Sequence, residues 1–161
     1  MQEYYRDTWA EIDLDAITHN VKQIKDLHPT KEIFAVVKAN GYGHGDAEVS
    51  KVAIEAGVSC LAVSGLDEAL RLRNSGIEVP ILVLGMTRLK DVPLAAENNI
   101  SLTAHDEMWI EHLVSLPLTT PIKVHLKIDS GMHRLGLMTE EQVQKNFNRL
   151  KTAPMVEVEG I

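Results

Sequence analysis

Short apolar runs alternate along this 161-residue chain with stretches in which apolar residues recur every three or four positions. The run Ile33–Val37 is almost continuously apolar, which is typical of a strand buried on both faces of a parallel sheet. The stretch after Asp15 places Ile17, Val21 and Ile24 on one face of a helix, with Asp15 as the expected cap. The same alternation continues along the chain and predicts a series of βα units.

The expected elements repeat one pattern, a strand followed by a helix, from residue 33 onward. A short strand over Thr8–Leu14 is expected before the first helix, because polar and apolar residues alternate there. The last helix carries a capping box from Thr139 to Gln142. Strands are expected at Ile33–Val37, Leu61–Val63, Ile81–Leu84, Ile100–Thr103, Ile122–Ile128 and Met155–Ile161. Helices are expected at Asp46–Gly57, capped by Asp46, and at Asp67–Ser75, Asp91–Asn98, Asp106–Ser115 and Thr139–Leu150.

Strands that alternate with helices predict an α/β fold with a parallel sheet. Two architectures agree with the pattern: an open doubly wound sheet, and a (β/α)8 TIM-type barrel that is incomplete, with about six of eight strands. No G-x-G-x-x-G follows the first strand of the series, which weakens the dinucleotide-binding version of the open sheet. The final stretch V-E-V-E-G-I has no polar tail, and this favours a barrel that has been cut short.

The amino-acid composition and charge argue against several classes of function. The chain is 45% hydrophobic and 24% charged, as in soluble globular proteins, and its formal net charge is −7. Nucleic-acid binding is not expected, because no cluster of Lys and Arg provides a basic face. The segment Met1–Arg6 lacks the apolar core of a secretory signal, and no apolar run is long enough for a membrane span, so a cytoplasmic protein is expected. The single cysteine, Cys60, lies in an apolar run and is expected to be a buried thiol.

The segment A-V-V-K-A-N-G-Y-G-H-G carries the first candidate chemistry. Lys38 ends a buried parallel strand, and the carboxyl ends of such strands carry the active site in both architectures. A lysine partly removed from water offers a neutral amine as a nucleophile or base, and this placement suits a Schiff base with an aldehyde. The glycines and the Tyr42 hydroxyl suit an anionic ligand. A surface lysine before a plain tight turn, with His44 in a structural role, fits the same residues.

The segment V-H-L-K-I-D-S-G-M-H-R-L-G repeats this plan about 90 residues later. Lys127 and Asp129 are expected on one side of the strand, because side chains alternate. Arg134 then lies on a loop at the same edge of the sheet as Lys38, where its guanidinium can bind a carboxylate through two hydrogen bonds. Taken alone, this segment also fits an ion-paired surface loop.

Together, the two segments resemble those of the alanine racemases, in the same order and at the same separation. The stretches Y-Y-R-D-T-W-A-E-I-D-L-D-A-I-T-H-N and L-A-V-S-G-L-D-E-A-L-R-L-R are similar to the same family, so the resemblance covers essentially the whole chain. It implies a (β/α)8 barrel that uses pyridoxal 5'-phosphate. Many members have alanine in place of Gly41.

The resemblance also implies roles for individual residues. Lys38 matches the lysine that holds the cofactor as an internal aldimine and serves as one base of a two-base racemisation. Tyr42 matches a tyrosine that contacts the cofactor phosphate. Arg134 matches an arginine that orients the cofactor phenolic oxygen and the substrate carboxylate, and Lys127 matches a lysine that is often carbamylated. No metal is implied.

The family's chains are more than twice as long as this one, so residues 1–161 are expected to be a partial barrel domain. The ring-stacking histidine, the last barrel strands and a β-rich second domain would lie beyond it. That domain supplies the other base, a tyrosine, to the partner subunit of a homodimer. Negligible racemisation by the piece alone is therefore expected. The full-length protein would convert L-alanine to D-alanine for peptidoglycan.

Other functions fit the sequence as well. Another fold-type III racemase, for serine, lysine or a broad set of amino acids, would share both segments. A non-catalytic pyridoxal phosphate-binding barrel would keep Lys38 and lack the second base. A scaffold without a cofactor would leave the lysine loop and the Lys127–Arg134 segment unexplained.

Overall fold

A computed structural model of the chain describes residues 7–161. Within this range, none of the helices has both the length and the apolar character needed to cross a membrane. The strands are β1 (Phe34–Val36), β2 (Cys60–Val63), β3 (Ile81–Val83), β4 (Ile100–Ala104), β5 (Ile122–Leu126) and β6 (Val156–Gly160). The helices are α1 (Leu14–Leu27), α2 (Lys38–Tyr42), α3 (Asp46–Glu55), α4 (Leu66–Asn74), η1 (Leu89–Asp91), α5 (Val92–Glu97), α6 (Glu107–Leu113) and α7 (Glu140–Thr152).

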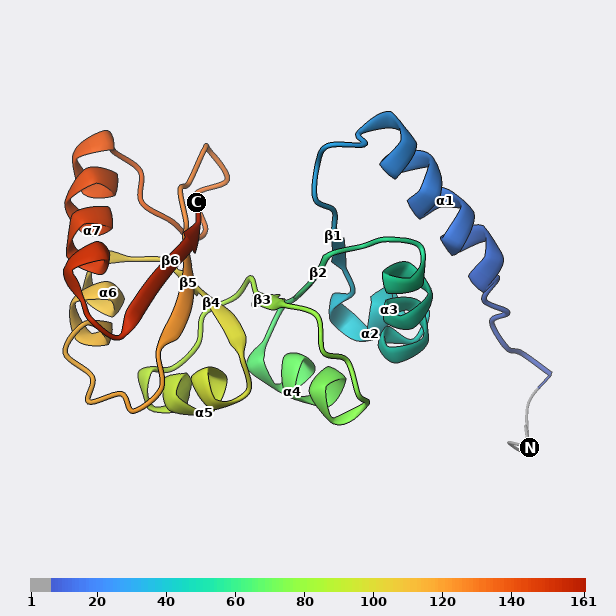
Figure 1. Cartoon of the computed structure of the whole chain (residues 1–161), viewed down its shortest axis with the longest axis horizontal. Helices are drawn as coiled ribbons and strands as arrows, with labels where there is room; N and C mark the ends of the chain where they lie inside the picture. Colours follow the sequence, from blue (N-terminus) through green and yellow to red (C-terminus); the bar gives the residue numbers. More distant parts are fainter. Residues whose placement is uncertain (1–6) are drawn as a thin grey trace.

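The strands form one parallel sheet in the order β1-β2-β3-β4-β5-β6. Figure 1 shows the sheet as an open arc, with helices α3 to α7 outside it and β1 and β6 at its two ends. The ring centroids of Phe34 on β1 and His125 on β5 lie 6.2 Å apart across the inside of this arc. The sheet therefore curls into an incomplete (β/α)8 barrel, which confirms the predicted fold class.

The core lies between the outer face of the sheet and the helices. Alternate residues of each strand point outward, among them Leu61, Val83 and Leu102, and all three are fully buried. Ile110 of α6 and Leu150 of α7 belong to the same buried cluster. Burial of each such side chain contributes about 1.5–3 kcal/mol, so this layer holds the arc together.

Polar side chains occupy the inner face of the sheet near its β6 end. The Glu159 carboxylate accepts a hydrogen bond from Ser101 Oγ at 2.7 Å and lies 3.4 Å from Lys123 Nζ and 3.5 Å from His125 Nε2. Burial raises the pKa of the Glu159 carboxyl, but the Ser101 hydrogen bond and the neighbouring Lys123 and His125 outweigh burial, so this pKa lies below its usual value. The cluster links β4, β5 and β6 from inside the barrel.

The sole cysteine also faces the inside of the arc. Cys60 is 6% exposed and unpaired, which confirms the expected buried thiol. Burial, with a further contribution from the Glu159 charge, raises the pKa of its thiol to about 12.

The amino-terminal segment differs from the sequence-based prediction. The strand expected at Thr8–Leu14 is not present, because residues 8–13 are irregular and α1 begins at Leu14. A strand needs a neighbour for its backbone hydrogen bonds, and within residues 7–161 this segment pairs with none. The cap of α1 is Asp13 rather than Asp15, and its carboxylate accepts a hydrogen bond from Ala16 N at 2.9 Å.

Two further predictions, the burial of the first strand and the cap of α3, are wrong because contacts between distant parts of the chain decide them. The first strand is not buried on both faces: Phe34 and Val36 are each 41% exposed, because β1 is an edge of the sheet and faces the open interior. Asp46 does not cap α3, whose N-cap is Gly45, and its carboxylate binds Arg71 instead. By contrast, the capping box of α7 between Thr139 and Gln142 is present as predicted.

Candidate active site at the carboxyl edge of the sheet

Lys38 lies two residues after the end of β1, at the edge where the strands of the sheet have their carboxyl ends, here called the carboxyl edge. Its side chain is half-buried, and its Nζ lies 5.9 Å from the centroid of the Tyr42 ring. Tyr42 itself is 59% exposed. Lys38 has no ion-pair partner within residues 7–161, so its amine is open to a ligand.

The turn after Lys38 is left-handed. Ala39, Asn40, Gly41 and Tyr42 have φ between 52° and 61°, a conformation in which only glycine is unstrained. For each non-glycine residue, this left-handed conformation costs about 1–2 kcal/mol. The backbone folds back over one turn, which brings the Tyr42 ring near the Lys38 amine. The glycine-rich stretch therefore forms a specific strained turn and not simply a flexible loop.

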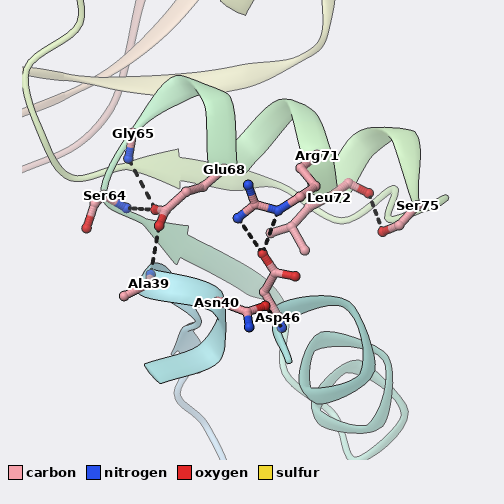
Figure 2. Close-up of polar contacts among 9 residues, drawn as sticks. All are labelled: Ala39, Asn40, Asp46, Ser64, Gly65, Glu68, Arg71, Leu72 and Ser75. Carbon is pink, nitrogen blue, oxygen red and sulfur yellow. Dashed lines mark hydrogen bonds and ion pairs between the residues drawn. The ribbon is translucent and has the colours of Figure 1, made fainter. Parts of the chain in front are cut away.

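A carboxylate from the next βα unit holds this turn. Glu68, in the first turn of α4, accepts hydrogen bonds from Ala39 N at 2.7 Å, Ser64 N at 2.7 Å and Gly65 N at 3.3 Å. Figure 2 shows its side chain between the lysine turn and the start of α4. One carboxylate thus joins the loops that follow β1 and β2.

A second connection runs through α3. Asn40 Oδ1 accepts a hydrogen bond from Asp46 N at 3.2 Å, and the buried Asp46 carboxylate accepts two from Arg71, at 2.7 and 3.0 Å (Figure 2). The Asp46 carboxylate raises the pKa of the Arg71 guanidinium above its usual value. His44, left open as a structural or acid–base residue, places its Nδ1 2.9 Å from the Gly41 carbonyl oxygen.

The second candidate segment forms a closed loop after β5. Leu137 N donates to the Lys127 carbonyl at 2.8 Å, and Asp129 N donates to the Leu137 carbonyl at 2.9 Å. Gly136 makes this approach possible, because a Cβ there would lie 2.6 Å from Asp129 N. Lys127 and Asp129 were expected on one side of a strand. The strand β5 ends at Leu126, so both residues lie in the loop after it.

Asp129 organises the interior of this loop. Its carboxylate accepts hydrogen bonds from Gly131 N at 2.9 Å and His133 N at 3.0 Å. These bonds hold the pKa of the Asp129 carboxyl below its usual value. The Lys127 side chain is exposed and lies outside this network.

Arg134 lines a hollow of about 400 Å³ at the carboxyl ends of β4 and β5. His105 and Asp106 form one wall, with His105 Nε2 2.9 Å from Asp106 Oδ2 and its ring against Trp109. Arg134 is exposed and makes no ion pair within residues 7–161. Met86 also lines the hollow. The Arg134 guanidinium therefore shares the hollow with an apolar side chain and with the Asp106 carboxylate.

The predicted site residues thus fall into two groups on one edge. Lys38 and Tyr42 are together, and Arg134 follows β5 at the same carboxyl edge. No hydrogen bond or ion pair joins the two groups in the described part of the chain. Within residues 7–161, the donor chemistry suits an aldehyde that carries a phosphate: a primary amine without an ion-pair partner, an exposed phenol on the same turn and an unpaired guanidinium at the same edge. On these grounds the residues fit pyridoxal phosphate.

The sequence-based candidates did not include Glu68 and gave Asp129 no role in shaping its loop. Glu68 stands three residues after Gly65, the N-cap of α4, which is the capping-box position. That spacing predicts its bond to the start of α4 but not the bond to Ala39. Asp129 precedes Ser-Gly, which is typical of a carboxylate that caps its own turn. Both could have been identified as local caps, although not as residues that shape the site.

The chain belongs to the class of α/β-barrel proteins with a site at the carboxyl ends of the strands. The curved sheet, the helices outside it and the candidate residues at the carboxyl edge define this class. Residues 12–161 match the family described as alanine racemase, N-terminal domain, and the chain belongs to this family. The chain is 52% identical over 163 residues to the alanine racemase of Geobacillus kaustophilus, covering 100% of this chain and 42% of that protein.

Solved structures agree with this assignment. The crystal structure of alanine racemase from Bacillus anthracis with bound L-Ala-P matches at a TM-score of 0.91 and 46% identity, over 99% of this chain and 42% of that one. A histidine racemase from Leuconostoc mesenteroides matches at a TM-score of 0.83 and 34% identity, over 89% of this chain and 39% of that one. The chain thus spans about two fifths of the length of these relatives.

Proposed function

We propose that this chain is part of a pyridoxal phosphate-dependent amino-acid racemase whose substrate is alanine. The observation that carries the proposal is the position of Lys38: a half-buried, unpaired amine at the carboxyl end of β1, within residues 7–161 of a chain from the alanine racemase family. The similarity to alanine racemases from several bacteria supports alanine as the substrate.

Each candidate residue has a distinct task in this proposal. When bound, pyridoxal phosphate supplies the electron sink that acidifies the Cα–H bond of the amino acid. Lys38 would hold the cofactor through Nζ, and its amine would remove or return the α-proton on one face of the substrate. The Tyr42 hydroxyl would donate a hydrogen bond to the cofactor phosphate. Arg134 binds the substrate carboxylate and the phenolic oxygen of the cofactor.

Lys127 is proposed to act through Arg134. Carbamylation would turn its ammonium group into an anion, which is favourable next to a guanidinium. The exposed side chain is accessible to carbon dioxide, and it makes no ion pair in the part of the chain that the structure describes. An NMR spectrum of the folded protein in isotope-labelled bicarbonate at mild alkaline pH tests this, and the carbamate carbon signal is expected to vanish in Lys127→Ala.

Racemisation needs a second base on the opposite face, and we propose that it comes from outside these 161 residues, in a β-rich domain of the partner subunit of a homodimer. The relatives' greater length leaves room for such a domain. The full-length protein would act in the cytoplasm and supply D-alanine for peptidoglycan. The 161-residue chain alone is expected to racemise alanine at a negligible rate, and robust turnover by the purified chain would contradict this.

A racemase for another amino acid is the second candidate. The similarity to a histidine racemase favours this candidate. That protein is 34% identical to this chain and has the same fold, yet its name gives histidine as the amino acid. Incubating the full-length protein with a panel of L-amino acids and measuring D-enantiomers distinguishes the two. Alanine is expected to give the highest kcat/KM.

The activity test of the whole proposal uses two lysine variants of the full-length protein. Lys38→Arg keeps the charge but cannot condense with an aldehyde, so its rate is expected to fall by at least about 10³-fold. Lys90→Arg, an exposed lysine of η1, is the matched control and keeps the wild-type rate. Full activity of Lys38→Arg would contradict the proposal.

A further inference from the structure

Glu68 makes an interaction that helix capping alone does not explain. A capping-box glutamate binds backbone N–H groups at the start of its own helix, as Glu68 does with Ser64 and Gly65. Its other oxygen, Oε1, crosses to Ala39 N in a different βα unit, at 2.7 Å. Hydrogen bonds of this length to an ionised carboxylate are among the stronger ones in proteins. Figure 2 shows this contact beside the lysine turn.

Ala39 is the residue at which the strained turn begins. It follows Lys38 directly and has φ 52° and ψ 50°, a left-handed conformation that alanine rarely adopts. Strained conformations persist only where the surrounding structure determines them. Glu68 fixes the amide of this residue, and Asn40 ties the next residue to α3 through Asp46 N. The peptide that carries Lys38 is therefore held from outside its own loop.

We propose that Glu68 is a positioning residue that sets the direction of the Lys38 amine by anchoring Ala39 N–H. This inference rests on the proposed function, since it assigns Glu68 a role toward the same lysine. Without the carboxylate, the turn can relax toward right-handed conformations, and the amine moves away from its reactive position. A displacement of about 1 Å at a reacting group can cost about 100-fold in rate.

The experiment compares Glu68→Ala with the unaltered full-length protein. We expect kcat to fall by about 100-fold, and borohydride trapping of pyridoxal phosphate on Lys38 to slow. Glu68→Gln keeps one acceptor oxygen but places an NH₂ group opposite the other donors, so an intermediate loss is expected. Hydrogen–deuterium exchange without cofactor provides a readout independent of activity: residues 38–43 are expected to exchange faster in Glu68→Ala.

Two controls separate positioning from loss of stability. Thr139→Ala removes a capping-box side chain from α7, on another part of the arc, and is expected to leave kcat and exchange at residues 38–43 unchanged. Glu55→Gln makes the same chemical change at an exposed glutamate of α3. Wild-type trapping, kcat and exchange in Glu68→Ala would overturn the positioning role alone. Absence of trapping on Lys38 in the unaltered protein would instead contradict the proposed function, and the positioning role with it.

Discussion

At the scale of single residues, the environment decides which ionisable groups are reactive. The Cys60 thiol is buried inside the arc, and burial raises its pKa to about 12. The Asp129 carboxylate lies in a loop whose N–H groups point at it, and those bonds lower its pKa. Lys38, in contrast, is half-buried and makes no ion pair within residues 7–161, so its amine is open to chemistry.

The first prediction concerns Cys60. Only the thiolate reacts with a disulfide reagent, and a pKa of about 12 leaves almost none at pH 8. The folded chain is expected to react with Ellman's reagent at least about 100-fold more slowly than the chain unfolded in guanidinium. Equal rates in the two states would show that the thiol is accessible in the folded protein.

The second prediction concerns pH and the loop that Asp129 organises. Its pKa lies below the ordinary value of 3.8 in the folded chain, so its stabilising contribution is fully present above that value. The contribution is lost as pH falls through the folded-state pKa. An NMR titration of the Asp129 carboxyl carbon is expected to show a midpoint below 3.8.

The same loop can be tested without titration. Asp129→Asn removes the charge that Gly131 N and His133 N bind, so both amides are expected to exchange faster at neutral pH. Asp26→Asn, at an exposed aspartate of α1, serves as the control. Unchanged exchange in Asp129→Asn would show that the loop does not depend on this carboxylate.

At the scale of elements, periodicity identified the six barrel strands and the helices between them, because apolar spacing directly reflects burial. It failed where contacts distant in sequence decide the conformation. Thr8–Leu14 alternates like a strand but has no pairing partner in residues 7–161. The left-handed turn could not be predicted from the sequence, since Ala39 disfavours this conformation. The carboxylate that anchors it belongs to Glu68, which is far away in sequence.

The third prediction concerns the cap of α7, which the sequence did identify. Thr139 Oγ1 accepts the Gln142 N–H at 3.2 Å, and Gln142 Oε1 accepts the Thr139 N–H at 3.2 Å. Thr139→Ala is expected to lower the free energy of unfolding by about 1 kcal/mol in urea denaturation. Thr119→Ala, at an exposed position outside the helices, is expected to change it by less than about 0.5 kcal/mol. Equal effects would contradict the capping role.

At the scale of the whole molecule, the arc is held unevenly. β2 to β5 have a neighbour on each side, whereas β1 and β6 have one neighbour each among residues 7–161. The prediction of an incomplete barrel already implied exposed sheet edges, whereas the burial of β1 on both faces, predicted from its apolar run, was wrong. An edge strand lacks half of its possible backbone hydrogen bonds and loses order first.

The fourth prediction follows from this unevenness. In hydrogen–deuterium exchange of the 161-residue chain, β3 and β4 are expected to be the slowest segments, and β1 and β6 the fastest of the strands. Protection of β1 equal to that of β4 would mean that a partner covers its free edge in solution.

The proposed function depends most on Lys38 as the residue that binds pyridoxal phosphate. The most direct measurement is to incubate the protein with pyridoxal phosphate, reduce it with borohydride, digest it and map the pyridoxyl group by mass spectrometry. The account predicts modification concentrated on Lys38 and lost in Lys38→Arg. Labelling spread over many lysines in the full-length protein, with Lys38 no more modified than exposed Lys90, would contradict it.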